Sequence, residues 1–158
     1  MKKQQNIIEF IEYSDPHKEI LKTLTLEWLE KYVSVEPEDE KFIENPRSYV
    51  IDKGGYIFLA KYNDEIIGTV SLCKVDDNTY ELAKLAVTEK YKGIKLGKQL
   101  IQLAIDKCKT VEARKIILYT AKKLEVAHAL YLQFGFLEIK TENQKYIESD
   151  TKMELDLK

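Results

Sequence analysis

The part of the sequence best suited to chemistry is a loop rich in glycine and lysine that follows an apolar segment. Gly93 and Gly97 let its backbone bend and approach a ligand closely. A helix that begins near Lys95 would point free N–H groups, which carry partial positive charge, toward that ligand. A pyrophosphate suits such a nest of amides. The loop therefore predicts an anion-binding site.

The positive charge around this loop favours the same ligand. Four lysines lie in or beside it: Lys90, Lys92, Lys95 and Lys98. Together they would raise the local concentration of a polyphosphate. The alternative is an ordinary loop, because two glycines before a helix are common and surface lysines are often only solvated. Neither a P-loop motif nor the Gly-x-Gly-x-x-Gly of a dinucleotide site is present, which disfavours ATP and NAD.

Length and composition exclude several classes of protein. The 158 residues carry 25 basic and 27 acidic side chains, and 44% are hydrophobic, so we expect one domain with its own core. We expect a cytoplasmic protein without a membrane partner, since the sequence lacks an apolar run of about 20 residues and a signal-peptide pattern. Cys73 and Cys108 lie in apolar segments, which favours buried, reduced thiols. His17 and His128 have no metal-ligand spacing around them, so we expect no metal site.

Hydrophobic periodicity predicts the elements that must position the loop. In chain order they are strand 7–13, helices 16–33 and 37–44, strands 56–61, 66–75 and 80–87, helix 95–109, strand 115–120, helix 124–134, and strands 137–141 and 152–157. The order is β-α-α-β-β-β-α-β-α-β-β. Residues 80–120 form a β-α-β unit, which requires parallel pairing of its two strands. We therefore predict a mixed α/β fold, with residues 6–157 in a single domain.

Three motifs resemble the GNAT superfamily of acyl-CoA-dependent N-acetyltransferases. They are the strand ELAKLAV at 81–87, the loop YKGIKLGK at 91–98, and A-x-x-x-Y-L-Q-F-G-F at 127–136. The resemblance extends over nearly the whole chain and includes the order of the elements. It implies a GNAT-like mixed sheet and acetyl-CoA as cosubstrate.

The resemblance assigns the anion site to coenzyme A. In the family, the backbone amides of the loop hold the CoA pyrophosphate. This role carries over to Lys92, Gly93, Ile94, Lys95, Leu96, Gly97 and Lys98. The first signature glycine of the family falls on Lys95, and we expect this lysine to have a negative φ, as is ordinary at a helix start. Leu85, Ala86 and Val87 would pair through their backbone with the pantetheine arm, as an added strand does.

The resemblance also implies three catalytic groups. Tyr131 matches the tyrosine that protonates the departing CoA thiolate, and a phenol with a pKa of about 10 is able to donate at neutral pH. The Leu85 N–H would stabilise the tetrahedral oxyanion. Glu81 matches a position that some members use as general base. The plainer alternatives are a core aromatic for Tyr131, an ordinary ladder hydrogen bond for Leu85 and a solvent-facing carboxylate for Glu81.

The resemblance places the acceptor end at the first two helices and at the region of the second and third strands. Its aromatic and acidic residues are Trp28, Tyr32, Glu36, Glu38, Asp39 and Glu40. An acidic wall would attract a cationic amine through its field. The alternative is a solvated helix face.

The leading hypothesis is therefore an N-acetyltransferase that moves acetyl from acetyl-CoA to a primary amine by direct attack in a ternary complex. The amine would belong to a small molecule or a protein. The alternative is a non-catalytic acyl-CoA binding or sensing module, because Lys95 replaces the family glycine. Nucleic acid is not expected as a partner, since no recognition motif accompanies the lysines. Homodimers are frequent in the family, so the resemblance adds a homodimer to the expectations.

Overall fold

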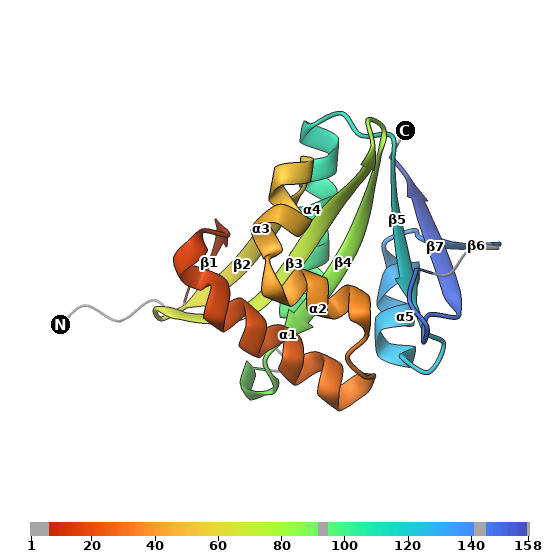
Figure 1. The fold of residues 1–158 in the computed structure, drawn as a ribbon. Coiled ribbons are helices and arrows are strands. Elements are labelled where there is room, and N and C mark those ends of the chain that lie inside the picture. Colours follow the sequence, from red (N-terminus) through yellow and green to blue (C-terminus); the bar gives the residue numbers. More distant parts are fainter. Residues whose placement is uncertain (1–6, 92–94, 141–144, 158) are drawn as a thin grey trace.

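A seven-stranded sheet runs through the computed structural model, which describes residues 7–91, 95–140 and 145–157 (Figure 1). Its strands are β1 (Ile8–Glu12), β2 (Tyr56–Tyr62), β3 (Glu65–Asp76), β4 (Thr79–Val87), β5 (Lys115–Thr120), β6 (Leu137–Ile139) and β7 (Thr151–Asp156), in the spatial order β1-β2-β3-β4-β5-β7-β6. β4 pairs with β5 in parallel, and the other neighbours are antiparallel. The predicted mixed α/β fold and its parallel β-α-β unit are confirmed.

The helices are α1 (Lys18–Tyr32), α2 (Pro37–Glu44), α3 (Pro46–Tyr49), α4 (Leu96–Thr110) and α5 (Glu125–Gln133). The sequence pattern did not indicate α3. Pro46 begins this short helix, because proline is tolerated at the first helical position and the Asn45 side chain accepts the Ser48 N–H at 3.2 Å. Within the described residues, no helix combines the length and apolarity needed to cross a membrane.

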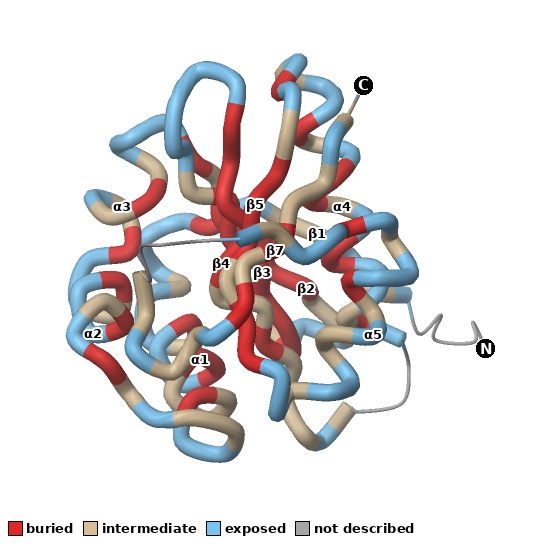
Figure 2. The backbone as a smooth tube through the Cα atoms, turned by 90° about the vertical axis from the view of Figure 1, so that its right-hand side faces the viewer, coloured by how far each residue is buried: buried red, intermediate tan, exposed pale blue. Residues whose placement is uncertain are grey.

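Helices cover both faces of the sheet, and β2 supplies a core to each face. Ile57 and Leu59 pack in one buried cluster with Phe42 of α2, whereas Phe58 and Ala60 belong to the cluster that includes α4. This division follows from the two-residue period of a strand, which sends alternate side chains to opposite faces. In Figure 2 many of the buried residues lie along the central strands, and the exposed residues lie mostly on the helices and loops around them.

A bulge interrupts β4. Ala83 of β4 pairs with Ser71 of β3, and Ala86 pairs with Thr69. The two β4 residues are three positions apart, whereas their β3 partners are two positions apart, so β4 has one extra residue. Lys84 lies in this extra length with a φ of +54°, in the left-handed region that side chains other than glycine rarely adopt. The bulge bends β4 beside the segment that the sequence motif marks for CoA.

β4 and β5 pair at one end only. The registered pairs join Thr79 to Lys115, Tyr80 to Ile116 and Glu81 to Ile117. Beyond Glu81 the two strands diverge (Figure 1). The sheet is therefore open between them, on the side where α5 lies and β4 ends.

We expect the variant Gly55→Ala to be strongly destabilised. A Cβ at this position would lie 2.3 Å from the Leu72 carbonyl oxygen and 2.9 Å from the Val50 carbonyl oxygen, so backbone would have to move. The free energy of unfolding should fall by about 2–3 kcal/mol, as for other overpacked sites. The urea midpoint measures this change.

The variant Gly97→Ala provides the matched control. A Cβ there meets nothing closer than the Leu130 side chain at 4.0 Å, and the residue lies in the first turn of α4. Its free energy of unfolding should stay level or rise by about 0.5 kcal/mol. Equal urea midpoints for the two variants would contradict the packing argument.

Candidate active site

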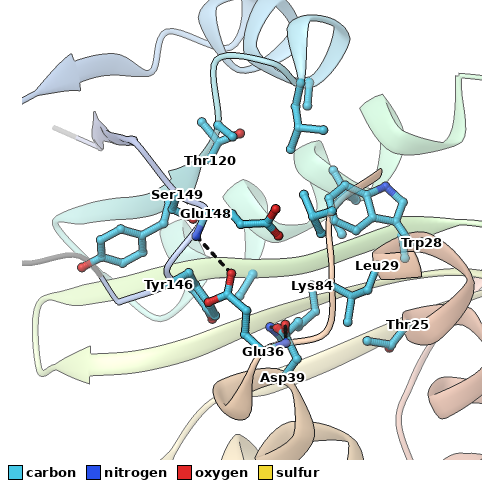
Figure 3. Close-up of a pocket in the computed structure, with 18 of the residues that line it drawn as sticks. Thr25, Trp28, Leu29, Glu36, Asp39, Lys84, Thr120, Tyr146, Glu148 and Ser149 are labelled. Carbon is cyan, nitrogen blue, oxygen red and sulfur yellow. Dashed lines mark hydrogen bonds and ion pairs between the residues drawn. The ribbon is translucent and has the colours of Figure 1, made fainter. Parts of the chain in front are cut away.

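Two hollows meet where β4 and β5 diverge. The acceptor cavity, as we call the first, has a volume of about 110 Å³ and lies between α1, the start of α2, β4, α5 and residues 146–149 (Figure 3). The second, the basic groove, has a volume of about 850 Å³ and extends along α5 to the start of α4. Five of the described residues line both hollows: Trp28, Leu85, Leu124, Ala127 and Tyr131. A ligand in the groove can therefore touch a ligand in the cavity.

The basic groove carries the charge expected of a polyphosphate site. Lys95, Lys98 and Lys123 line it, against Glu125 as the one acidic residue of the described lining. The groove also reaches the first turn of α4, whose N–H groups have no partner within the helix. The sequence pattern did not single out Lys123.

The predicted loop residues fall partly within the described structure. Leu96, Gly97 and Lys98 line the groove with Lys95, as the motif implied. The predictions for Lys92, Gly93 and Ile94 lie outside the described residues.

Lys95 has the opposite backbone conformation to the one predicted. Its φ is +58° and its ψ is +28°, which is left-handed, so the expected negative φ is wrong. The chain turns into α4 at this residue, and the turn imposes a dihedral that glycine adopts freely and lysine adopts at a cost of roughly 1–2 kcal/mol. Lys95 thus takes a conformation suited to the glycine it replaces.

The strand residues predicted to meet pantetheine border both hollows. Ala86 lines the cavity, Val87 lines the groove, and Leu85 lines both. In the register of β3 with β4, neither Lys84 nor Leu85 has a paired residue, because the bulge falls there. The Leu85 backbone therefore lies at the junction, where the predicted oxyanion contact would be needed.

Tyr131 also lies at the junction. It is 8% exposed, and its ring packs against Phe136 with the centroids 5.9 Å apart. Burial raises the pKa of Tyr131 to about 12, so the phenol is protonated at neutral pH. Within the described part of the chain, its hydroxyl makes no hydrogen bond. Tyr131 is thus a core aromatic that also keeps a donor for a ligand.

Glu81 is buried rather than solvent-facing. It is the third residue of β4 and is 3% exposed, so the solvent-facing alternative is wrong. Its carboxylate accepts a hydrogen bond from Lys145 Nζ at 2.6 Å, with the Tyr146 hydroxyl at 3.5 Å. Burial alone would lower the pKa of Lys145, but attraction and hydrogen bonding to Glu81 outweigh it and raise the pKa. To accept a proton, Glu81 would have to give up this ion pair.

Two acidic residues at the start of α2 bind other segments of the protein. The two Glu36 carboxylate oxygens accept the N–H groups of Ile147 at 2.6 Å and Glu148 at 3.1 Å (Figure 3). Asp39 forms an ion pair with Lys84 and accepts the Glu36 N–H at 2.9 Å. Both acids are buried, so neither a freely available acidic wall nor a solvated face describes them. Glu38 and Glu40 line neither hollow.

The two predicted aromatic residues lie in different places. Trp28 lines both hollows, and Tyr32 lines the groove alone, with its hydroxyl donating to Glu89 at 2.7 Å. Tyr119, Tyr146 and Glu148 also line the cavity, and the sequence analysis missed them. Residues 146–149 follow no periodic pattern that would have indicated their position.

The thiols are unsuited to act as nucleophiles. Burial is the main cause that raises the pKa of Cys73 to about 11 and that of Cys108 to about 12, so both are protonated at neutral pH. Both are free cysteines. Across residues 7–91, 95–140 and 145–157, no group of three His, Cys, Asp or Glu side chains could hold a metal ion.

Comparisons with known proteins point to one family. The model of the acetyltransferase (GNAT) family matches residues 19–136. N-alpha-acetyltransferase 30 of Schizosaccharomyces pombe is 31% identical over an alignment of 97 residues, and the match covers 58% of this chain and 64% of that protein. The chain thus spans less than two thirds of the curated relative that it matches.

Solved structures share the fold. An acetyltransferase of the GNAT family from Staphylococcus aureus is 29% identical, with a TM-score of 0.87 over 96% of this chain and 100% of that chain. PaiA N-acetyltransferase from Thermoplasma acidophilum, solved with coenzyme A, is 22% identical, with a TM-score of 0.74 over 95% and 99%. Spermidine N-acetyltransferase from Vibrio cholerae, solved with CoA and spermine, is 18% identical, with a TM-score of 0.75 over 95% of both chains. The last two show the fold alone.

We expect Lys145→Met to lower the free energy of unfolding by about 2–3 kcal/mol, because it leaves the buried Glu81 carboxylate without its cation. The pKa of Lys145 is raised, so its contribution is complete below its ordinary pKa of about 10.4 and is lost as the pH rises past it. Urea unfolding at pH 7 and above about pH 10.5 should show the difference from wild type shrinking.

Lys115→Met is the control for this experiment. Lys115 pairs with Glu154 at 3.7 Å on the surface, and such pairs contribute less than about 1 kcal/mol. A loss as large as that of Lys145→Met would show that burial of Glu81 is not the cause.

Proposed function

Because the chain belongs to the acetyltransferase (GNAT) family, we propose that it transfers an acetyl group from acetyl-CoA to a primary amine. The observation that carries this proposal is the junction of a basic groove with a small cavity, lined by charged and apolar side chains, at Tyr131 and Leu85. Acetyl-CoA occupies the groove and the amine occupies the cavity. Both reactants are then held together, which supplies most of the advantage over reaction in water.

The residues of the groove fit coenzyme A. Lys95, Lys98 and Lys123 offer positive charge to its phosphates, and the first turn of α4 offers amides. The pantetheine arm lies in the opening between β4 and β5 and pairs with the backbone at Leu85 and Val87, as an added strand would. The thioester then reaches the junction with the cavity.

The reaction proceeds by direct attack. The neutral amine nitrogen adds to the thioester carbonyl carbon, and the Leu85 N–H stabilises the oxyanion. The C–S bond then breaks, and its electron pair stays on sulfur. The nitrogen loses one proton and the thiolate gains one, so the products are an amide and the CoA thiol. Tyr131 donates a hydrogen bond to the leaving sulfur. With a pKa of about 12 it is a weaker acid than a free phenol, and it is fully protonated for this task.

The charges of the cavity favour an acceptor with a single amine. Among the described residues, four carboxylates line it: Glu36, Asp39, Glu81 and Glu148. Each already accepts hydrogen bonds from the protein, from backbone N–H groups, Lys84, Lys145 or Lys123. A polycation would have to displace these partners. Trp28, Leu29 and Val33 add an apolar part to the lining, which suits an apolar group next to the amine.

The fraction of amine that is neutral at pH 7 favours an α-amine as the acceptor. With a pKa of about 7.7–8.0, roughly one α-amine in eight is neutral at pH 7, against roughly one in 2,500 lysine side chains with a pKa of about 10.4. An α-amine therefore needs less help from a base, and Glu81 is engaged by Lys145. The name of the curated relative, N-alpha-acetyltransferase 30, agrees with this choice. We propose a peptide amino terminus with an apolar first side chain as the acceptor.

We expect Tyr131→Phe to lower kcat about 100-fold, at the lower end of the effect of a proton donor. The dissociation constant for acetyl-CoA should change less than twofold, because the ring stays in place. Stopped assays of CoA release and calorimetric titration measure the two quantities. The control is Tyr56→Phe, which alters a tyrosine of β2 outside both hollows and should behave as wild type.

The same experiment tests the alternative of an acyl-CoA sensor. A sensor would bind acetyl-CoA but acetylate no amine in any variant. Turnover by wild type together with the selective loss in Tyr131→Phe supports the enzyme.

We expect a lysine-free peptide with a free amino terminus and an apolar first residue to be the best acceptor. Its kcat/KM should exceed that of spermidine, and that of the amino-blocked peptide with one lysine, at least tenfold. Release of CoA measures all three at pH 7. A higher kcat/KM for spermidine would overturn the proposed acceptor and leave the acetyl transfer itself intact.

A further inference from the structure

Lys84 is a charged residue in an unusual place. Its backbone has a φ of +54° in the bulge of β4, and its side chain is only 8% exposed. The ammonium pairs with Asp39 of α2, whose side chain is 4% exposed. Burying two charges is costly, and apolar residues of similar volume often replace such a pair without loss of stability. Stability alone therefore does not explain this pair.

The Lys84–Asp39 pair is the first link of a polar chain, which we call the Lys84 chain. Asp39 Oδ2 accepts the Glu36 N–H at 2.9 Å. The Glu36 carboxylate then accepts the N–H groups of Ile147 at 2.6 Å and Glu148 at 3.1 Å. Figure 3 shows Lys84, Asp39, Glu36 and Glu148 along one side of the acceptor cavity. The bulge is thus connected through α2 to the segment 145–149.

A direct contact supports the same connection. The Lys84 ammonium lies 4.6 Å from the centre of the Tyr146 ring and 5.9 Å from the centre of the Phe42 ring. Tyr146 lines the acceptor cavity. One side chain therefore contacts both α2 and the wall of the cavity, while its own backbone forms the bulge beside Leu85.

We propose that Lys84 is a positioning residue that couples the bulge of β4 to the wall of the acceptor cavity. This inference rests on the proposed acetyl transfer for its catalytic consequence. The bulge sets where the Leu85 N–H meets the thioester, and the segment 145–149 sets where the amine lies. A shift of about 1 Å between two reactants can cost 100-fold in rate. The Lys84 chain keeps the positions of the thioester and the amine fixed relative to each other.

The double variant Lys84→Met/Asp39→Asn separates positioning from stability. It leaves no unpaired buried charge, and the introduced amide oxygen can still accept the Glu36 N–H, so the melting temperature should stay close to that of wild type. Its kcat should fall about tenfold, while the dissociation constant for acetyl-CoA changes less than twofold. Lys61→Met is the control, because Lys61 pairs at 3.6 Å with the exposed Asp64 outside both hollows. Wild-type kcat in the double variant would overturn the inference.

Hydrogen exchange tests the coupling without turnover. In wild type, acetyl-CoA should slow the exchange of the Ile147 and Glu148 amides, because the ligand fixes the bulge and the Lys84 chain transmits the constraint. In the double variant this slowing should be lost, although acetyl-CoA still binds. Equal slowing in both proteins, or none in wild type, would overturn the coupling. Slowing in a wild type that acetylates no amine would support the coupling and reject the proposed function.

Discussion

The early end of the pairing between β4 and β5 is the constraint on which the site depends. Inside a sheet, backbone N–H and C=O groups that lose their neighbour must find other partners, since leaving them buried and unpaired costs about 1–3 kcal/mol each. Here the strands separate after Glu81, next to the bulge at Lys84. The opening is therefore a site that an extended ligand with amide groups can complete. Leu85 and Tyr131 line both the groove and the cavity at this opening.

The acceptor cavity illustrates how buried charge can define geometry. Its carboxylates are paired with lysines or backbone amides from α2, β4 and the segment 145–149. Buried polar networks of this kind are costly when any member is unpaired, so they tolerate few alternative arrangements. The same pairing leaves little free negative charge to attract a polycation. The shape and the electrostatics of the cavity thus have a common origin.

Local patterns predicted most of the fold, and several of the predicted site residues line the two hollows. The strand meander and the helix after the glycine loop follow from periodicity, because those features are encoded over short stretches of chain. The sign of φ at Lys95 was wrong, since a turn dihedral depends on how the next helix is placed. The partners of Glu36 and Glu81 were missed, because they lie 111 and 64 residues away in the sequence.

The wide sequence separation of those partners has a consequence for folding. Contacts between the start of α2 and the segment 145–149 close long loops, so their entropy cost is met only after the sheet has formed. The acceptor cavity is then the last part to assemble. By the same reasoning it opens first under mild denaturing conditions, while the sheet persists. A partly unfolded molecule would therefore lose the wall formed by residues 145–149 and keep the sheet together with α4.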